Sequence, residues 1–327
     1  MYHVKTMNKI SKIGLAELDD RFEISDTMEH EDAILVRSAK LHDYDFPAEL
    51  LCIARAGAGV NNIPLDRAAE AGIVVFNTPG ANANGVKELT IAALLLASRK
   101  ISQGITWVKE QAAAGADVAA VVEKGKAAYV GPEIQGKTLG VVGLGAIGVL
   151  VANAAAALGM QIVGYDPFLS VQHALNLTPG VKVVSTLEEL YGQADYISLH
   201  LPMTPETKGT LNDAAFAAMK DGVRIVNLAR GELVDTEALK AALASGKCAA
   251  YVTDFPNSET AAMEGVVAIP HLGASTPESE DNCAMMAARQ VRDYLDNGNI
   301  VNSVNLPVLS MAWAAKNRVC VLTKGAD

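Results

Sequence analysis

The 327-residue sequence has few aromatic residues, only four cysteines and no apolar run long enough to cross a membrane. Its strongest apolar segment, residues 89–97, is too short for a bilayer, and the N-terminus carries no secretory signal pattern. The cysteines lie mostly in apolar segments, which argues against a disulfide framework or a zinc site and indicates reduced thiols of a cytoplasmic protein; they are Cys52, Cys248, Cys283 and Cys320. No metal is therefore expected.

Positive charge is also scarce, because 27 Lys and Arg stand against 37 Asp and Glu and leave a net charge of −10. This balance argues against nucleic acid or an anionic membrane as a partner. A site for an anionic substrate must then be a local basic pocket in an acidic protein. The length favours two domains, and the Ala- and Gly-rich composition is typical of an α/β enzyme.

A glycine-rich turn, G-L-G-A-I-G at residues 143–148, separates an apolar run from a longer apolar stretch. This is the G-x-G-x-x-G pattern of a strand-to-helix turn: Gly143 permits the tight turn, Gly145 lets a pyrophosphate approach the backbone, and Gly148 lets the helix pack on its strand. The next predicted strand ends in Asp166, at the spacing of an acid that accepts ribose hydroxyls. Such an acid repels a 2′-phosphate, so we expect NAD; the alternative is a glycine turn in an unrelated α/β domain.

Predicted strands alternate with helices along most of the chain. We expect strands at Val4–Thr6, Phe22–Ile24, Ala33–Val36, Leu51–Ala54, Ile73–Phe76, Leu139–Val142, Gln161–Tyr165, Lys182–Val184, Tyr196–Leu199, Arg224–Asn227, Ala249–Val252 and Val266–Ile269. Helices are expected between most of them, with long ones at Asn84–Lys100 and Pro277–Asp296. This alternation predicts an α/β fold of two doubly wound parallel-sheet domains.

The restart of the pattern after residue 136 predicts a Rossmann NAD-binding domain inserted into a flavodoxin-like substrate-binding domain. We assign residues 1–98 and 276–303 to the substrate-binding domain and residues 99–275 to the NAD-binding domain. Residues 304–327 form a C-terminal tail.

Three side chains at predicted strand ends or nearby loops offer the chemistry of alcohol oxidation. Arg230 directly follows an apolar strand, and its planar guanidinium suits a carboxylate beside a carbonyl. His271 also follows a strand and can act as the acid/base. Glu259 is near enough in sequence to contact His271, and a carboxylate there fixes the imidazole tautomer and favours its charged form. Taken singly, the three have ordinary alternatives: a solvated arginine, a structural histidine and an exposed acid.

The chain resembles the D-isomer-specific 2-hydroxyacid dehydrogenases in runs that occur in the family's order over about the first three hundred residues. These runs are VVGLGAIG at 141–148, GYDP at 164–167, HLPMTPET at 200–207, NLARGELVDTEAL at 227–239, Asp254, Glu259 and PHLGAST at 270–276. The resemblance implies that Arg230 binds the substrate carboxylate, Glu259 tunes the histidine and His271 is the acid/base. It places Asp254 at the nicotinamide amide. The implied NAD contacts are Ala58, Gly143, Gly145, Ala146, Ile147, Gly148, Asp166, His200, Leu201, Pro202, Thr207, Leu228, Ala229, Arg230, Asp254, His271, Gly273 and Ala274.

Within this family, runs at 34–39, 54–62, 77–80 and 87–89 are most similar to members that oxidise D-3-phosphoglycerate to 3-phosphohydroxypyruvate, the first step of L-serine biosynthesis. The expected partner is thus a small phosphorylated 2-hydroxy acid. Arg37 and Arg55, at predicted strand ends, are expected to hold its phosphate, and Lys87 is a weaker candidate. A glycine-rich loop offers its N–H groups to the substrate carboxylate; it comprises Ala56, Gly57, Ala58, Gly59 and Val60.

Two other functions stay open at this stage. A glyoxylate/hydroxypyruvate reductase, or another D-2-hydroxyacid reductase, would use the same chemistry without a phosphate site. An NAD-sensing regulatory or corepressor protein would share the fold without the reaction.

Several positions depart from the family's usual pattern. Ala146 replaces a basic residue, and Asp-Phe-Pro at 254–256 replaces Asp-Val-Phe. An Ala-rich segment at 112–128 replaces an aromatic-rich one, although we still expect a homodimer through the NAD-binding domain. The stretch at 105–126 has helix propensity but a poor apolar stripe, so it is expected to contact a partner subunit or to be mobile. Residues 318–323 resemble the first strand of an ACT regulatory domain, but too few residues follow for a complete one.

Overall fold

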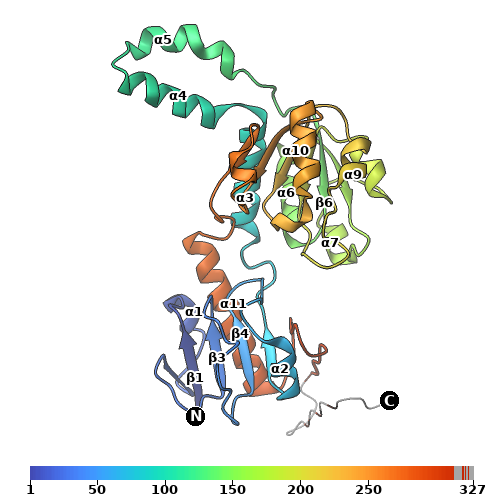
Figure 1. Ribbon diagram of the computed structural model, residues 1–327. Coiled ribbons are helices and arrows are strands. Elements are labelled where there is room, and N and C mark those ends of the chain that lie inside the picture. Colours follow the sequence, from blue (N-terminus) through green and yellow to red (C-terminus); the bar gives the residue numbers. More distant parts are fainter. Residues whose placement is uncertain (313–318, 320, 322, 324–327) are drawn as a thin grey trace. The chain divides into compact units, whose positions relative to one another are not determined.

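The computed structural model describes residues 1–312, 319, 321 and 323. The chain forms two compact units: unit 1 comprises Met1–Asn82 and Ser275–Asp327, and unit 2 comprises Ala83–Ala274. Each unit contains one sheet of parallel strands with helices packed against it (Figure 1). The predicted α/β class, with two doubly wound parallel sheets, is therefore confirmed.

The unit 1 sheet has five strands in the order β2-β1-β3-β4-β5, which is the flavodoxin-like order. Every neighbouring pair is parallel. The strands are β1 (Tyr2–Met7), β2 (Phe22–Ser25), β3 (Ala33–Val36), β4 (Cys52–Arg55) and β5 (Val74–Phe76). All four residues of β3 are buried, as expected for a central strand covered on both faces.

Helix α11 (Pro277–Asn297) covers one face of this sheet together with the short α1 (Lys12–Leu15). Its start is well defined, because Thr276 Oγ1 accepts a hydrogen bond from the N–H of Ser279 at 3.1 Å. Its buried side chains contact Val4, Leu35 and Ala54 of the sheet within one hydrophobic cluster; they include Ala284, Ala287, Ala288 and Val291. Helix α2 (Leu65–Glu70) belongs to the cluster on the opposite face.

The unit 2 sheet has seven parallel strands in the order β12-β11-β10-β9-β6-β7-β8. The strands are β6 (Thr138–Val142), β7 (Gln161–Tyr165), β8 (Lys182–Val183), β9 (Tyr196–Leu199), β10 (Val223–Asn227), β11 (Cys248–Thr253) and β12 (Val266–Ala268). Counted from β6, the order 3-2-1-4-5-6 of a Rossmann fold is followed by one further edge strand. The predicted Rossmann domain is therefore present.

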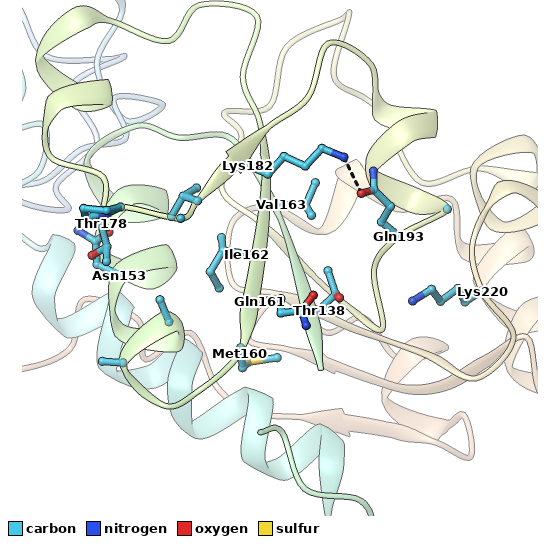
Figure 2. Close-up of a pocket in the computed structure, with 16 residues that line it drawn as sticks. Thr138, Asn153, Met160, Gln161, Ile162, Val163, Thr178, Lys182, Gln193 and Lys220 are labelled. Atoms are coloured by element: carbon cyan, nitrogen blue, oxygen red, sulfur yellow. Dashed lines mark hydrogen bonds between the residues drawn. The ribbon is translucent and has the colours of Figure 1, made fainter. Parts of the chain in front are cut away.

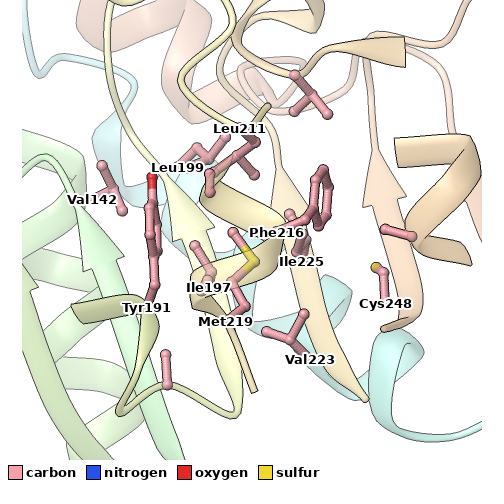
Figure 3. Close-up of a cluster of buried hydrophobic side chains, with 14 of the residues drawn as sticks. Val142, Tyr191, Ile197, Leu199, Leu211, Phe216, Met219, Val223, Ile225 and Cys248 are labelled. Carbon is pink, nitrogen blue, oxygen red and sulfur yellow. The ribbon is translucent and has the colours of Figure 1, made fainter. Parts of the chain in front are cut away.

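Two hydrophobic clusters hold helices on the two faces of this sheet. One contains α3 (Ala83–Ser98) and α6 (Ala146–Ala157) with Val141 of β6. The other contains α8 (Leu187–Tyr191), α9 (Asp213–Ala218) and α10 (Thr236–Ser245) with Val142, and Figure 3 shows Phe216 and Met219 close to Ile225. The remaining short elements of unit 2 are α7 (Val171–Leu175), η2 (Gly231–Leu233) and η3 (Thr260–Ala262).

Helices α4 (Ile101–Ala113) and α5 (Val118–Gly125), followed by η1 (Lys126–Tyr129), form an arm that extends from the rest of unit 2 (Figure 1). None of the three elements contains a buried residue. The rings of Trp107 and Tyr129 lie 5.4 Å apart and hold the base of the arm together. The missing apolar stripe in the sequence thus corresponds to helices that lie outside the hydrophobic core.

The compact units divide the chain at 82/83, whereas the domain boundary predicted from the sequence lies at 98/99. The difference is α3, which contacts α6, β10 and β11 and so belongs to unit 2. Residues 318, 320 and 322 of the strand expected at 318–323 lie outside the described residues. Within the part that is described, no helix has the length and apolar character that a membrane crossing requires.

Candidate active site

The glycine turn after β6 brings the start of α6 against the strand. A Cβ on Gly148 would overlap the carbonyl oxygen of Gly143, and one on Gly143, where φ is +94°, would lie 2.8 Å from the carbonyl oxygen of His200. In contrast, a Cβ on Gly145 would meet no atom within 4 Å, and no side chain caps the N-terminus of α6. The turn therefore leaves open space beside uncapped N–H groups, which fits a pyrophosphate.

Asp166 follows β7 and is bonded to this turn. Its Oδ2 accepts a hydrogen bond from the N–H of Leu144 and its Oδ1 one from the N–H of Phe168, both at 2.8 Å. A carboxylate oxygen can accept more than one hydrogen bond, so both oxygens keep acceptor capacity for ribose hydroxyls. The position expected for the ribose therefore lies next to the one expected for the pyrophosphate.

His200 follows β9, on the other side of the turn. Its backbone N–H donates to the carbonyl of Val142 at 2.8 Å, and its ring Nε2 forms a hydrogen bond with Ser198 Oγ at 2.9 Å. Burial lowers the pKa of His200 to about 4, so the imidazole is neutral near pH 7. A neutral imidazole is better suited to line the wall of a dinucleotide site than to transfer a proton in catalysis.

The loop after His200 is held by Thr207. Its Oγ1 donates to the carbonyl of Pro202 at 2.7 Å and accepts from the N–H of Thr204 at 2.8 Å. The same loop places Leu201 so that its Cδ2 would lie 3.2 Å from a Cβ on Gly143. The structure thus brings these predicted cofactor residues to the carboxyl ends of β6 and β9.

Arg230 lies in the turn after β10, which is shaped by Asn227. The amide of this buried residue donates to the carbonyl of Arg230 at 2.8 Å and accepts from the N–H groups of Ala229 at 3.1 Å and Arg230 at 3.3 Å. The turn also carries Leu228, a predicted cofactor contact. This role of Asn227 was not predicted from the sequence, although a polar residue at the end of an apolar strand was a signal for it.

Phe255 contacts two of the three candidate catalytic residues of unit 2, Arg230 and His271. The Arg230 guanidinium carbon lies 5.4 Å from the centroid of its ring, a cation–π distance, and the His271 ring lies 4.3 Å away, centroid to centroid. The sequence showed Phe255 only as a departure from the family's pattern. In the structure, the Phe255 ring contacts both Arg230 and His271.

Glu259 is half-exposed, and its Oε1 accepts a hydrogen bond from Lys240 Nζ at 3.0 Å. Lys240 lies on α10 and was not among the residues expected at the site. The predicted tuning of His271 by Glu259 stays a prediction.

Asp254 is 1% exposed at the end of β11. Its Oδ2 accepts from the N–H of Gly273 at 3.2 Å, whereas its Oδ1 is buried with no hydrogen-bond partner among the described residues. Burial raises the pKa of Asp254, while the Gly273 N–H and the charge of His271 act in the opposite direction. A buried acceptor without a donor fits the amide N–H expected from a nicotinamide. Ala274, another predicted contact, is the last residue of unit 2.

The glycine-rich loop of unit 1 is anchored through its carbonyls. Gly57 accepts from the N–H of Thr78 at 3.1 Å, and Ala58 accepts from Asn77 Nδ2 at 2.7 Å. Within the described residues, the N–H groups of residues 58–60 donate no hydrogen bond. The other two N–H groups of the loop that was expected to bind a substrate carboxylate already donate, Ala56 to the carbonyl of Val36 at 2.8 Å and Gly57 to that of Arg55 at 2.9 Å. Only the N–H groups of residues 58–60 therefore fit the expected role.

The two predicted phosphate-binding arginines are neighbours in unit 1. Arg55 ends β4, Arg37 directly follows the adjacent β3, and Arg55 Nε donates to the carbonyl of Arg37 at 3.2 Å. Lys87, the weaker candidate, lies on α3 in unit 2 with its Nζ 3.7 Å from a carboxylate oxygen of Glu88. The structure therefore groups the arginines and assigns the lysine to the other unit.

A cavity of about 910 Å³ lies at the opposite edge of the unit 2 sheet, near the amino ends of β6, β7 and β8 (Figure 2). It is lined by Ile162, Val163 and polar side chains, with Lys182 Nζ donating to Gln193 Oε1 at 2.9 Å. None of the predicted site residues lines it. Among the described residues, no group of three or more His, Cys, Asp or Glu side chains could hold a metal ion.

Residues 91–273, more than half of the chain, match the family model for the NAD binding domain of D-isomer specific 2-hydroxyacid dehydrogenases. The chain belongs to this family. The match lies within unit 2 and includes the glycine turn, Asp166, Asp254 and His271. The resemblance seen in the sequence and the expected cofactor, NAD, are therefore confirmed.

Individual relatives extend the similarity beyond this domain. The D-3-phosphoglycerate dehydrogenase of Rattus norvegicus is 37% identical over 292 residues, covering 86% of this chain and 52% of the relative. The chain spans about half the length of the curated relatives it matches.

Two solved structures cover nearly the whole of both chains. An NAD+-bound 3-phosphoglycerate dehydrogenase of Entamoeba histolytica is 27% identical with a TM-score of 0.71, covering 93% of this chain and 99% of that one. A glyoxylate reductase of Paecilomyes thermophila is 28% identical with a TM-score of 0.75, covering 93% and 98%. The folds of the two units are thus shared with family members that carry different names.

The lowered pKa of the half-buried His200 predicts a specific pH dependence of stability. In the unfolded chain a histidine binds a proton below about pH 6.5, whereas His200 in the fold stays neutral down to about pH 4. The unfolded state binds more protons between these values, so the free energy of unfolding falls as the pH falls, by about 3 kcal/mol over the window. Above this window the histidine has no effect on the pH slope.

His200→Gln should remove this part of the slope. Urea unfolding of the wild type and the variant at several pH values between about 7 and about 4 measures it. Equal losses of stability in the two proteins would show that His200 titrates normally in the fold.

Proposed function

We propose that this protein is an NAD-dependent dehydrogenase that oxidises D-3-phosphoglycerate to 3-phosphohydroxypyruvate, the first step of L-serine biosynthesis. The observation that carries the choice of substrate is the pair of neighbouring arginines, Arg37 and Arg55, at adjacent strand ends of unit 1. Two guanidinium groups suit a phosphate, which accepts charge-assisted hydrogen bonds on three oxygens. The similarity to proteins named D-3-phosphoglycerate dehydrogenase supports the same choice.

The residues of unit 2 supply the groups that the oxidation needs. Arg230 binds the substrate carboxylate through its planar guanidinium. His271 accepts the proton of the C2 hydroxyl as the C2 hydrogen leaves with its electron pair, which gives the keto acid and an imidazolium. When bound, NAD supplies the acceptor for that hydride. Asp254 Oδ1 and the N-terminus of α6 hold the cofactor in place.

Glu259 stabilises the imidazolium in this proposal. Its ion pair with Lys240 is on the surface, where such pairs contribute at most about 1 kcal/mol, so the carboxylate can exchange partners at little cost. Phe255, in contact with both Arg230 and His271, limits the orientations that their side chains adopt.

The main rival is a reductase of glyoxylate or hydroxypyruvate, which is favoured by the similarity to the Paecilomyes thermophila glyoxylate reductase. It would use Arg230 and His271 in the same way without a substrate phosphate. A regulatory NAD sensor is the rival of a different class, because it would need the cofactor site alone.

The function is tested by following NADH during incubation with D-3-phosphoglycerate and NAD, alongside NADH consumption with glyoxylate and hydroxypyruvate. We expect the phosphorylated acid to have the highest kcat/KM. His271→Ala should lower kcat at least about 100-fold, because it removes the acid/base, while NADH binding measured by fluorescence is retained.

The control is His42→Ala, which removes an exposed histidine of unit 1 outside the site. Turnover of glyoxylate without turnover of D-3-phosphoglycerate would replace the substrate. Full activity of His271→Ala would exclude the mechanism, and an intact cellular role in a strain that carries this variant would favour the sensor.

We further propose that the protein is a cytoplasmic homodimer whose subunits join through the α4–α5 arm of unit 2. The arm bounds a cavity of about 960 Å³ lined by Ile101, Ile105, Trp107 and Tyr129, and Ile105 is 52% exposed. Apolar surface on two helices without buried residues suits burial against a second copy. The free cysteines among the described residues fit a reducing compartment.

Ile105→Glu should shift the protein from dimer to monomer, because it places a charge in the apolar contact. Sedimentation velocity measures the change. Leu175→Glu is the matched control, since Leu175 is also exposed and helical in unit 2 but lies on α7. A monomeric wild type, or an Ile105→Glu protein that stays dimeric, would contradict the proposed interface.

A further inference from the structure

An acidic side chain accompanies the two arginines of unit 1. Glu280, near the start of α11, forms an ion pair with Arg37, with Oε1 2.7 Å from Nη2. Both side chains are partly exposed, at 44% and 41%. This pair occupies hydrogen-bonding positions of one arginine that the proposed function assigns to a phosphate.

The fold directs Arg37 and Glu280 toward the same point. Side chains alternate along a strand, and Leu35 contacts α11 residues in one cluster, so Arg37, two residues later, continues on the face that α11 covers. On α11, Glu280 lies one turn before Cys283 and Ala284, which are buried on the side that faces the sheet. The ion pair therefore follows from the position of Arg37 after β3 and the position of Glu280 on α11.

Arg55 lies on the neighbouring strand, and its Nε donates to the carbonyl of Arg37 at 3.2 Å. A Cβ on Gly57 would overlap Arg55 Nη1, so the guanidinium lies directly against the loop backbone. Burial raises the pKa of the Cys283 thiol, the charges of Arg55 and Arg37 lower it, and the charge of Glu280 raises it. All three charges thus act on one buried thiol of α11, in agreement with the ion pair of Arg37 with Glu280 and the hydrogen bond from Arg55 to the Arg37 carbonyl.

We propose that Glu280 is a specificity-determining residue of the phosphate site: its carboxylate occupies Arg37 until a phosphate displaces it, and so weakens the binding of phosphorylated ligands. This inference rests on the proposed function for the identity of the substrate. A dianionic phosphate displaces the carboxylate because it pairs with both arginines, whereas Glu280 contacts Arg37. The displaced Glu280 carboxylate stays close by, and its negative charge repels the bound phosphate.

The inference predicts a gain of affinity when the charge is removed. Glu280→Gln should bind inorganic phosphate about fivefold more tightly than the wild type, measured by isothermal titration calorimetry without cofactor. The KM for D-3-phosphoglycerate should fall by a similar factor, while the KM for D-glycerate, which lacks the phosphate, stays unchanged. Arg37→Met should weaken phosphate binding instead.

Glu278→Gln is the matched control, because it removes the same charge from the same helix at a position two residues away, which does not face the same side. It should keep the affinity of the wild type for phosphate. An equal gain in both variants would assign the effect to net charge and overturn the role of Glu280.

The two levels of the proposal fail separately. If Glu280→Gln binds phosphate no better than the wild type, or if neither binds it, the inference about Glu280 is wrong, whatever the substrate. If the gain in phosphate affinity is present but D-3-phosphoglycerate is not oxidised, the anion site stands and the proposed substrate is wrong.

Discussion

The close approach of α6 to β6 is the constraint on which the site in unit 2 depends. Gly148 and Gly143 make this approach possible, since a Cβ at either position would meet backbone atoms of the turn or of the neighbouring strand end. The approach directs the N-terminus of α6 at the carboxyl edge of the sheet and leaves the space beside Gly145 open. Asp166 closes the turn by accepting the N–H of Leu144. A side chain at Gly143 or Gly148 would push α6 or the turn away from this position and so disrupt the site.

Parallel strands explain why the remaining groups gather at one edge. In each unit all strands point the same way, so the residue that follows each strand lies at the same edge of the sheet. In unit 2 this rule accounts for Asp166, His200 and Asp254, with Arg230 and His271 a few residues further along. In unit 1 it accounts for Arg37 beside Arg55. The chemistry of the chain is therefore organised by strand direction, and the cavity at the opposite edge carries none of it.

The sequence predicted what depends on local patterns and missed what depends on tertiary contacts. Apolar runs and glycine spacing predicted the strands, the two sheets and the turn, because those features are determined by backbone geometry and burial. The missed contacts join residues that are distant in sequence or unremarkable in type. They are the contacts of Phe255 with Arg230 and His271, the hydrogen bond from Asn227 to the Arg230 carbonyl, and the ion pair of Glu280 with Arg37. Glu259 shows the same limit, since its Lys240 partner lies on another element. The alternation of strands and helices also could not assign α3 to a unit, because its packing on α6 decides this.

The most direct test of the account compares alanine at two glycines of the same turn. Gly145→Ala should leave the free energy of unfolding within about 0.5 kcal/mol of the wild type, because its Cβ meets no atom, and yet weaken NADH binding at least about tenfold by occupying the space of the pyrophosphate. Gly148→Ala should instead destabilise the fold by about 2 kcal/mol or more, because its Cβ overlaps the Gly143 carbonyl. Urea unfolding and NADH fluorescence titration measure both effects. A Gly145→Ala protein that binds NADH as tightly as the wild type would contradict the placement of the cofactor at this turn.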